Sequence, residues 1–137
     1  MTNLFTYGSL MCEDIMLHVS GEKVAYQKAR LNDFFCSQIH GETYPGITPA
    51  KGEIVEGVLY FDLSLNAFAK LDTFEGEYYE RKKIAVHCSS QDLIAATAYI
   101  IKPQYNQLLT GNFWRFEDFL RSGKKEFEKN YVGFTQI

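Results

Sequence analysis

Most of this chain alternates between apolar stretches and short runs of turn-forming residues. Residues 79–88 place apolar side chains on one face and mostly charged ones on the other, which predicts a half-buried strand. Residues 93–101 are almost continuously apolar, as is typical of a central strand. Similar patterns, rich in aromatic and β-branched residues, predict further strands at 3–7, 24–30, 34–39 and 54–61. The sequence Tyr44-Pro45-Gly46 predicts a turn.

The remaining periodic stretches have the three- and four-residue spacing of helices. The first is expected to be capped by Ser9, a residue type that caps helices, and to continue through His18, with Gly21 as its stop signal. The second begins at Asp62 or Ser64, and the third occupies residues 112–130. The apolar residues that share a face are Leu65, Phe68 and Leu71 in the second helix, and Phe116, Phe119, Leu120 and Phe127 in the third.

These elements predict an α+β fold in one domain spanning residues 1–137, a length that suits a single domain. Short turns join most strands, and the helices are inserted rather than alternating with strands. We therefore expect an antiparallel or mixed sheet that closes into a small β-barrel flanked by helices. The sequence has no glycine-rich phosphate loop, so nucleotide binding has no support.

Composition narrows the functional classes. A net charge of −3 with both signs mixed gives no basic face, so we expect no nucleic-acid partner. Cys12, Cys36 and Cys88 are odd in number and far apart, which fits reduced thiols better than a disulfide framework or a metal motif. The histidines lack zinc-site spacing, and no metal is expected. With no signal peptide and no apolar run of about 20 residues, we expect a cytoplasmic protein without a membrane segment.

Two short sequences carry the residues best suited to chemistry. Tyr7-Gly8-Ser9-Leu10 follows the first predicted strand, and a glycine turn there leaves backbone amides that can hold an anion. Glu75 stands between Phe74 and Gly76 at the end of the second predicted helix. A partly buried glutamate has a raised pKa and can move a proton near neutral pH. On these residues alone, a plain turn and a solvated helix end remain open as alternatives.

Five motifs together resemble the γ-glutamylcyclotransferase superfamily, and within it the AIG2-like branch. In chain order they are Tyr7-Gly8-Ser9-Leu10, Tyr44-Pro45-Gly46-Ile47, Val55-Glu56-Gly57-Val58, Leu71-Asp72-Thr73-Phe74-Glu75-Gly76 and Tyr79-Glu80-Arg81. The resemblance spans about residues 3–102, and the stretch around Trp114 resembles the tail helix of bacterial members less specifically. Leu10 stands where vertebrate-type cyclotransferases have asparagine, and resembles the AIG2-like and glutathione-degrading branches instead.

The resemblance implies a compact mixed barrel with a cavity at one end, and an enzyme that uses no metal or cofactor. Such enzymes cyclise the γ-glutamyl group of a small γ-glutamyl amine or amino acid to 5-oxoproline and release the amine. By the same resemblance, Glu75 is the catalytic acid/base, and the substrate-holding loop is Tyr7, Gly8, Ser9 and Leu10.

Tyr79 and Arg81 complete the predicted substrate-binding set. We expect Tyr79 to form a wall of the cavity, whereas Arg81 either pairs with a carboxylate or lies on the surface. Tyr7 contributes its hydroxyl or simply packs, and a Cβ at Gly8 would block the approach of a ligand to the backbone. The leaving amine stays open, and so does a non-catalytic module that binds a small carboxylate or a peptide end. We expect a monomer or a weak homodimer whose contact uses apolar residues of the last helix.

Overall fold

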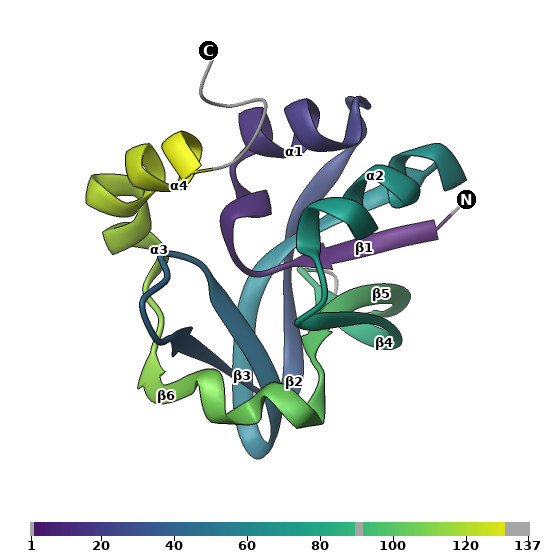
Figure 1. Ribbon diagram of the computed structural model, residues 1–137. Helices are drawn as coiled ribbons and strands as arrows, with labels where there is room; N and C mark the ends of the chain where they lie inside the picture. The colour runs from purple at the N-terminus through teal and green to yellow at the C-terminus, as the bar shows by residue number, and fades with distance from the viewer. Residues whose placement is uncertain (1, 90–91, 131–137) are drawn as a thin grey trace.

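The computed structural model describes residues 2–89 and 92–130, and its centre is a closed β-barrel (Figure 1). In the described part of the chain, five strands close the barrel in the order β3-β1-β5-β4-β2, with β2 pairing back to β3. All neighbours are antiparallel except β1 and β5, and β6 extends the sheet beside β2. The strands are β1 (Thr2–Thr6), β2 (Tyr26–Ile39), β3 (Pro45–Leu63), β4 (Tyr79–Cys88), β5 (Leu93–Ile101) and β6 (Leu109–Phe113). The predicted α+β barrel is confirmed.

The strand predictions were right where the pattern was regular. Strands β4 and β5 have the predicted bounds, and β1 differs by one residue at each end. The two strands predicted at 24–30 and 34–39 are instead one strand, β2. Its register shifts around Asp33, which has a φ of 67° and accepts a hydrogen bond from the Gly52 amide at 2.9 Å. A bulge therefore replaces the predicted break.

The predicted turn at Tyr44-Pro45-Gly46 is wrong, because Pro45 and Gly46 begin strand β3. Proline is tolerated at the first residue of a strand, where its missing amide costs no ladder bond. Gly46 is needed for packing: a Cβ there would lie 2.3 Å from Cγ1 of Ile101 on β5. Turn-forming residue types at this point thus serve the close approach of two barrel strands.

Helices α1 (Glu13–Ser20) and α2 (Leu65–Glu75) lie together at one end of the barrel (Figure 1). Ser9 does not cap α1 as predicted; it begins a separate 3-10 helix, Ser9–Met11. The predicted end at Gly21 is confirmed, with a left-handed φ of 76°. In α2 the Ser64 hydroxyl caps the helix by accepting from the Ala67 amide at 3.1 Å. Phe68 and Leu71 are buried as predicted, whereas the Leu65 side chain is 86% exposed.

The C-terminal helical segment begins later than the predicted residue 112. Residues 112 and 113 end strand β6, and a 3-10 helix, Pro103–Leu108, precedes that strand. The segment consists of α3 (Phe116–Asp118), a π-helical turn (Phe119–Gly123) and α4 (Lys124–Asn130). Phe119 and Phe127 are buried as predicted, but Leu120 is exposed, since the π-helical turn breaks the expected spacing. None of the helices in the described ranges is long and apolar enough to cross a membrane.

Candidate active site

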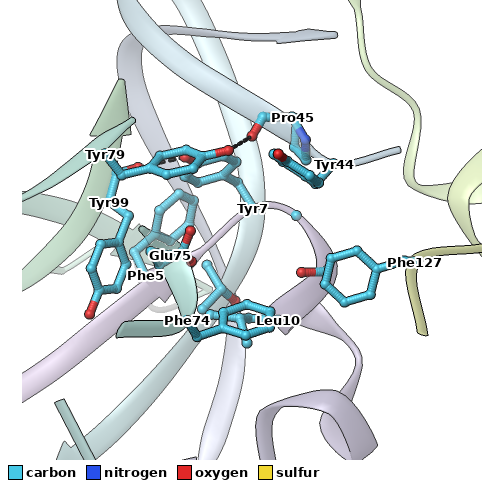
Figure 2. Close-up of a pocket in the computed structure, with 13 residues that line it drawn as sticks. Phe5, Tyr7, Leu10, Tyr44, Pro45, Phe74, Glu75, Tyr79, Tyr99 and Phe127 are labelled. Carbon is cyan, nitrogen blue, oxygen red and sulfur yellow. Dashed lines mark hydrogen bonds between the residues drawn. The ribbon is translucent and has the colours of Figure 1, made fainter. Parts of the chain in front are cut away.

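A pocket opens where the loop after β1, the last turn of α2 and the C-terminal helical segment meet (Figure 2). Its empty volume, including the mouth open to solvent, is about 470 Å³. The lining residues are residues 5–10, Tyr44, Pro45, Phe74, Glu75, Tyr79, Tyr99 and Phe127. Every predicted site residue except Arg81 lines this pocket.

The loop after β1 uses its carbonyl groups and leaves its amides available. The Gly8 and Ser9 carbonyls accept from the amides of Met11 and Cys12 at 3.0 and 3.1 Å. The Leu10 carbonyl accepts from the buried Tyr60 hydroxyl at 2.8 Å. Within the described residues, the amides of Gly8, Ser9 and Leu10 donate no hydrogen bond to the protein. Three N–H donors in one loop on the wall of a pocket are a suitable partner for a carboxylate or an oxyanion.

Gly8 is required for a reason that the sequence did not indicate. Its φ of −129° is negative, so a left-handed conformation is not the reason. A Cβ at this position would lie 2.8 Å from Cδ of Pro45. The immediate obstacle to a side chain is therefore the proline on β3, and this contact holds the loop against the barrel.

Glu75 is the last residue of α2, directly before the C-cap Gly76. Its carboxyl lies between the rings of Tyr7 and Tyr79 on one side and Phe74 on the other (Figure 2). Burial raises the pKa of Glu75 to about 8, with a smaller contribution from the negative charge of Asp72. In the part of the chain that the structure describes, this carboxyl has neither a hydrogen bond nor an ion pair. Glu75 is thus a free acid poised to exchange a proton slightly above neutral pH.

The hydroxyl groups of Tyr7 and Tyr79 donate hydrogen bonds to main-chain carbonyls of the barrel strands. Tyr7 donates to the carbonyl of Tyr99 at 2.5 Å, and Tyr79 donates to the carbonyl of Pro45 at 2.7 Å (Figure 2). Burial raises the pKa of Tyr7 well above its usual value, which keeps the phenol protonated. Both rings are buried and form walls of the pocket.

Arg81 is the one predicted substrate-binding residue that does not line this pocket. Arg81 lies outside the lining and pairs with Asp72, with Nε 3.1 Å from Oδ1. Its guanidinium also lies 4.4 Å from the centre of the Phe68 ring. Of the two alternatives that the sequence left open, the pairing with a carboxylate is the observed one.

The predicted site set omitted Phe5 and Thr6, which end β1, and also four pocket residues from other parts of the chain: Tyr44, Pro45, Tyr99 and Phe127. Tyr44 and Pro45 were hidden in a supposed turn, and Tyr99 in an apolar strand. Phe127 had the helical spacing of a core residue, and it does make edge contacts with Phe74 and Phe119, at 5.9 and 5.7 Å between ring centres. A core residue of the C-terminal segment is therefore also a wall of the site.

Other nucleophiles and metal ligands contribute little in the described structure. Cys12, Cys36 and Cys88 are buried free thiols. Burial raises the pKa of Cys12 to about 11 and that of Cys36 to about 12, so few thiolates form near neutral pH. Across residues 2–89 and 92–130, no three His, Cys, Asp or Glu side chains gather as a metal site would require.

A closed five-stranded barrel, with a partly buried acid and free loop amides lining one pocket, places this protein in the cyclotransferase fold class. Residues 4–116 match the family described as gamma-glutamyl cyclotransferase, AIG2-like. The chain is 31% identical to AIG2-like protein D of Arabidopsis thaliana, over 99% of this chain and 90% of that protein. The chain therefore belongs to the AIG2-like gamma-glutamyl cyclotransferase family.

Solved structures agree on the fold. A solution structure of an Arabidopsis thaliana protein has a TM-score of 0.73 at 24% identity, covering 98% of this chain and 91% of that one. A structure described as gamma-glutamyl cyclotransferase has a TM-score of 0.61 at 20% identity, covering 78% of this chain and 75% of that one. At these identities the likeness concerns the barrel and its helices.

Proposed function

We propose that this protein is a cofactor-independent γ-glutamylcyclotransferase that converts the γ-glutamyl group of a small γ-glutamyl amine to 5-oxoproline. The observation that carries the proposal is that the Glu75 carboxyl and the free amides of Gly8, Ser9 and Leu10 line the same pocket. Family membership supports the same chemistry.

The reaction needs one group that first accepts and then returns a proton. The Glu75 carboxylate removes a proton from the α-ammonium group of the substrate, and the freed nitrogen attacks the γ-carbonyl carbon. The amide nitrogen of the leaving amine then takes the proton from Glu75 as the γ C–N bond breaks. The extra proton on the new ring nitrogen passes to Glu75 and from there to the released amine, which leaves as an ammonium ion, so the carboxylate is regenerated and nothing is consumed.

The loop amides supply the electrostatic part. They bind negative charge, either on the α-carboxylate of the substrate or on the γ-carbonyl oxygen as the ring closes. Because ring closure is intramolecular, correct folding of the substrate chain lowers the activation free energy of ring closure by roughly 7 kcal/mol or more. The aromatic walls, which include Phe74 and Tyr79, keep that substrate folded and exclude water.

The test is an amine-release assay on a panel of γ-glutamyl compounds, with 5-oxoproline measured as the second product. The panel includes γ-glutamyl amino acids, a γ-glutamyl-lysine isopeptide, glutathione and γ-glutamyl alkylamines. We expect Glu75→Gln to abolish both products, because glutamine cannot accept the proton. Glu77→Gln is the matched control, since Glu77 is exposed and does not line the pocket. Full activity in Glu75→Gln would refute the catalytic role.

The raised pKa of Glu75 also supports a second candidate, a binding module without turnover. With a pKa of about 8, the carboxyl is largely protonated at neutral pH and can donate a hydrogen bond to a bound carboxylate. Binding of 5-oxoproline or a γ-glutamyl compound, measured by calorimetry, with no amine release over the whole panel would favour this candidate.

A further inference from the structure

Asp72, the residue one helical turn before Glu75, is held by contacts from two barrel strands. The Tyr99 hydroxyl on β5 donates to Oδ1 of Asp72 at 2.6 Å. The Arg81 guanidinium on β4 reaches both carboxylate oxygens, with Nε 3.1 Å from Oδ1 and Nη2 3.3 Å from Oδ2. Arg81 is itself held over the Phe68 ring. The carboxylate of Asp72 thus joins the end of α2 to β4 and β5.

This cluster lies on the outer side of a pocket wall. Tyr99 lines the pocket, and its main-chain carbonyl accepts the hydrogen bond from Tyr7. Its side-chain hydroxyl points away from the centre of the pocket (Figure 2), to Asp72. Asp72 and Arg81 line a shallow groove outside, which shares Tyr79 and Tyr99 with the pocket. One tyrosine therefore connects the substrate loop, through Tyr7, to the residue that precedes Glu75 by one turn.

We propose that Asp72, Arg81 and Tyr99 form a positioning cluster for Glu75. The cluster fixes the last turn of α2 against β4 and β5, and the Arg81 cation offsets the negative charge that Asp72 presents to Glu75. Arg81 is then a positioning residue and not a substrate ligand. Any effect of the cluster on catalysis rests on the proposed function, whereas its effect on the pKa of Glu75 does not.

The charges around Glu75 give the proposal a specific signature. The titratable and charged groups that line the pocket or flank it are Tyr7, Tyr44, Tyr79 and Tyr99, with Asp72 on α2 and Arg81 and Lys83 on β4. The tyrosines are neutral near pH 7, so the nearby charges are one anion and two cations. Removing the Asp72 anion should make Glu75 easier to ionise. Removing the Arg81 cation, which contacts Asp72, should make Glu75 harder to ionise.

Lys83 provides a matched control for Arg81. It lies two residues further along β4, lines the same outer groove and carries the same charge. The structure records no ion pair between Lys83 and Asp72 in its described residues. Lys83→Met therefore removes a positive charge from the groove without releasing the carboxylate of Asp72.

The experiment is an NMR titration of the Glu75 side-chain carboxyl in the full chain labelled with ¹³C-glutamate, with Glu75→Gln used to assign the signal. We expect Asp72→Asn to lower the titration midpoint of Glu75 by about half a pH unit, the effect of a charge about 6 Å away with strong solvent screening. Arg81→Met should raise the midpoint by a similar amount, and Lys83→Met should move it less. Amide spectra check that each variant is folded; Asp72 and Arg81 are 47% and 32% exposed, so both positions tolerate substitution.

A purely structural role has a different signature. If the cluster only supported the helix end, both Asp72→Asn and Arg81→Met would loosen it, admit water to Glu75 and lower the midpoint. Shifts in the same direction, or shifts no larger than that of Lys83→Met, would overturn the proposal. The titration needs no substrate, so opposite shifts in a protein without amine release would retain the cluster and reject the proposed enzyme. In an active protein, the acidic limb of kcat/KM against pH should move with the midpoint in each variant.

Discussion

Glu75 should make this protein less stable as the pH rises, and Glu75→Gln should remove that loss. Folding raises the pKa of this carboxyl from 4.5 to about 8, chiefly through burial. Between these two pH values the folded state keeps the proton on Glu75 while the unfolded state has released it. The unfolded state then binds fewer protons, so the free energy of unfolding falls with rising pH throughout this window.

The size of the effect follows from the shift. One pKa unit corresponds to about 1.4 kcal/mol, so the full shift corresponds to about 5 kcal/mol. Because the side chain is only partly buried, solvent screening reduces this figure, and we expect about 3 kcal/mol. The contribution is present in full below about pH 4.5 and is lost by the time the pH passes about 8.

Urea unfolding at several pH values from about 5 to about 9 measures the effect directly. Other carboxyl groups also titrate, so the informative quantity is the free energy of unfolding of Glu75→Gln minus that of the natural protein. This difference should grow with pH by about 3 kcal/mol and level off above about pH 8. Glu77→Gln, which removes an exposed carboxyl two residues away, should give a difference that hardly changes. A flat difference for Glu75→Gln as well would show that Glu75 is not buried as an acid, and the reasoning about the site would fail.

Two further substitutions test how the pocket is built. Gly8→Ala brings a Cβ to 2.8 Å from Cδ of Pro45, and this overpacking should lower the free energy of unfolding by about 1–3 kcal/mol. The loop should move as a result, and ligand affinity should fall. An unchanged melting temperature together with unchanged binding by calorimetry would contradict this. Ser64→Ala removes the N-cap of α2 and should lower the free energy of unfolding in urea by about 0.5–2 kcal/mol. The titration midpoint of Glu75 should stay the same, because the contacts of Asp72 hold the other end of the helix. An altered midpoint would show that the whole helix positions the acid.

The fold was predictable where local pattern and tertiary packing agree. The regular alternation of β4, the apolar run of β5 and the Ser64 cap of α2 are each determined by nearby residues. Prediction failed where a distant contact decides the conformation. Pro45 and Gly46 are turn-forming residue types, but the requirement at position 46 comes from Ile101, more than fifty positions further along the chain.

The site shows the same division between local and distant information. Family motifs identified Glu75 and the loop, and the structure places them in one pocket. They did not locate Arg81. The alternation of the strand puts Tyr79 and Arg81 on the same face of β4, but it does not say how deeply either side chain is buried. The salt bridge to Asp72 and the ring of Phe68 decide where that side chain lies, and both partners are on α2. Strand periodicity assigns a face, but only packing of a second element on that face assigns a pocket.

The arrangement around Glu75 combines two features that cost stability, an acid without a partner and backbone amides without acceptors. The barrel explains how such a site persists. Strand β1 pairs with β3 on one side and β5 on the other, so the loop that follows it begins at a fixed position. The carbonyls of Gly8, Ser9 and Leu10 accept from Met11, Cys12 and Tyr60. Because each carbonyl shares a peptide plane with the next amide, these bonds fix the orientation of the Ser9 and Leu10 amides. Because α2 is tied to β4 and β5 through Asp72, the helix end that carries Glu75 is held at the same pocket that the loop residues line.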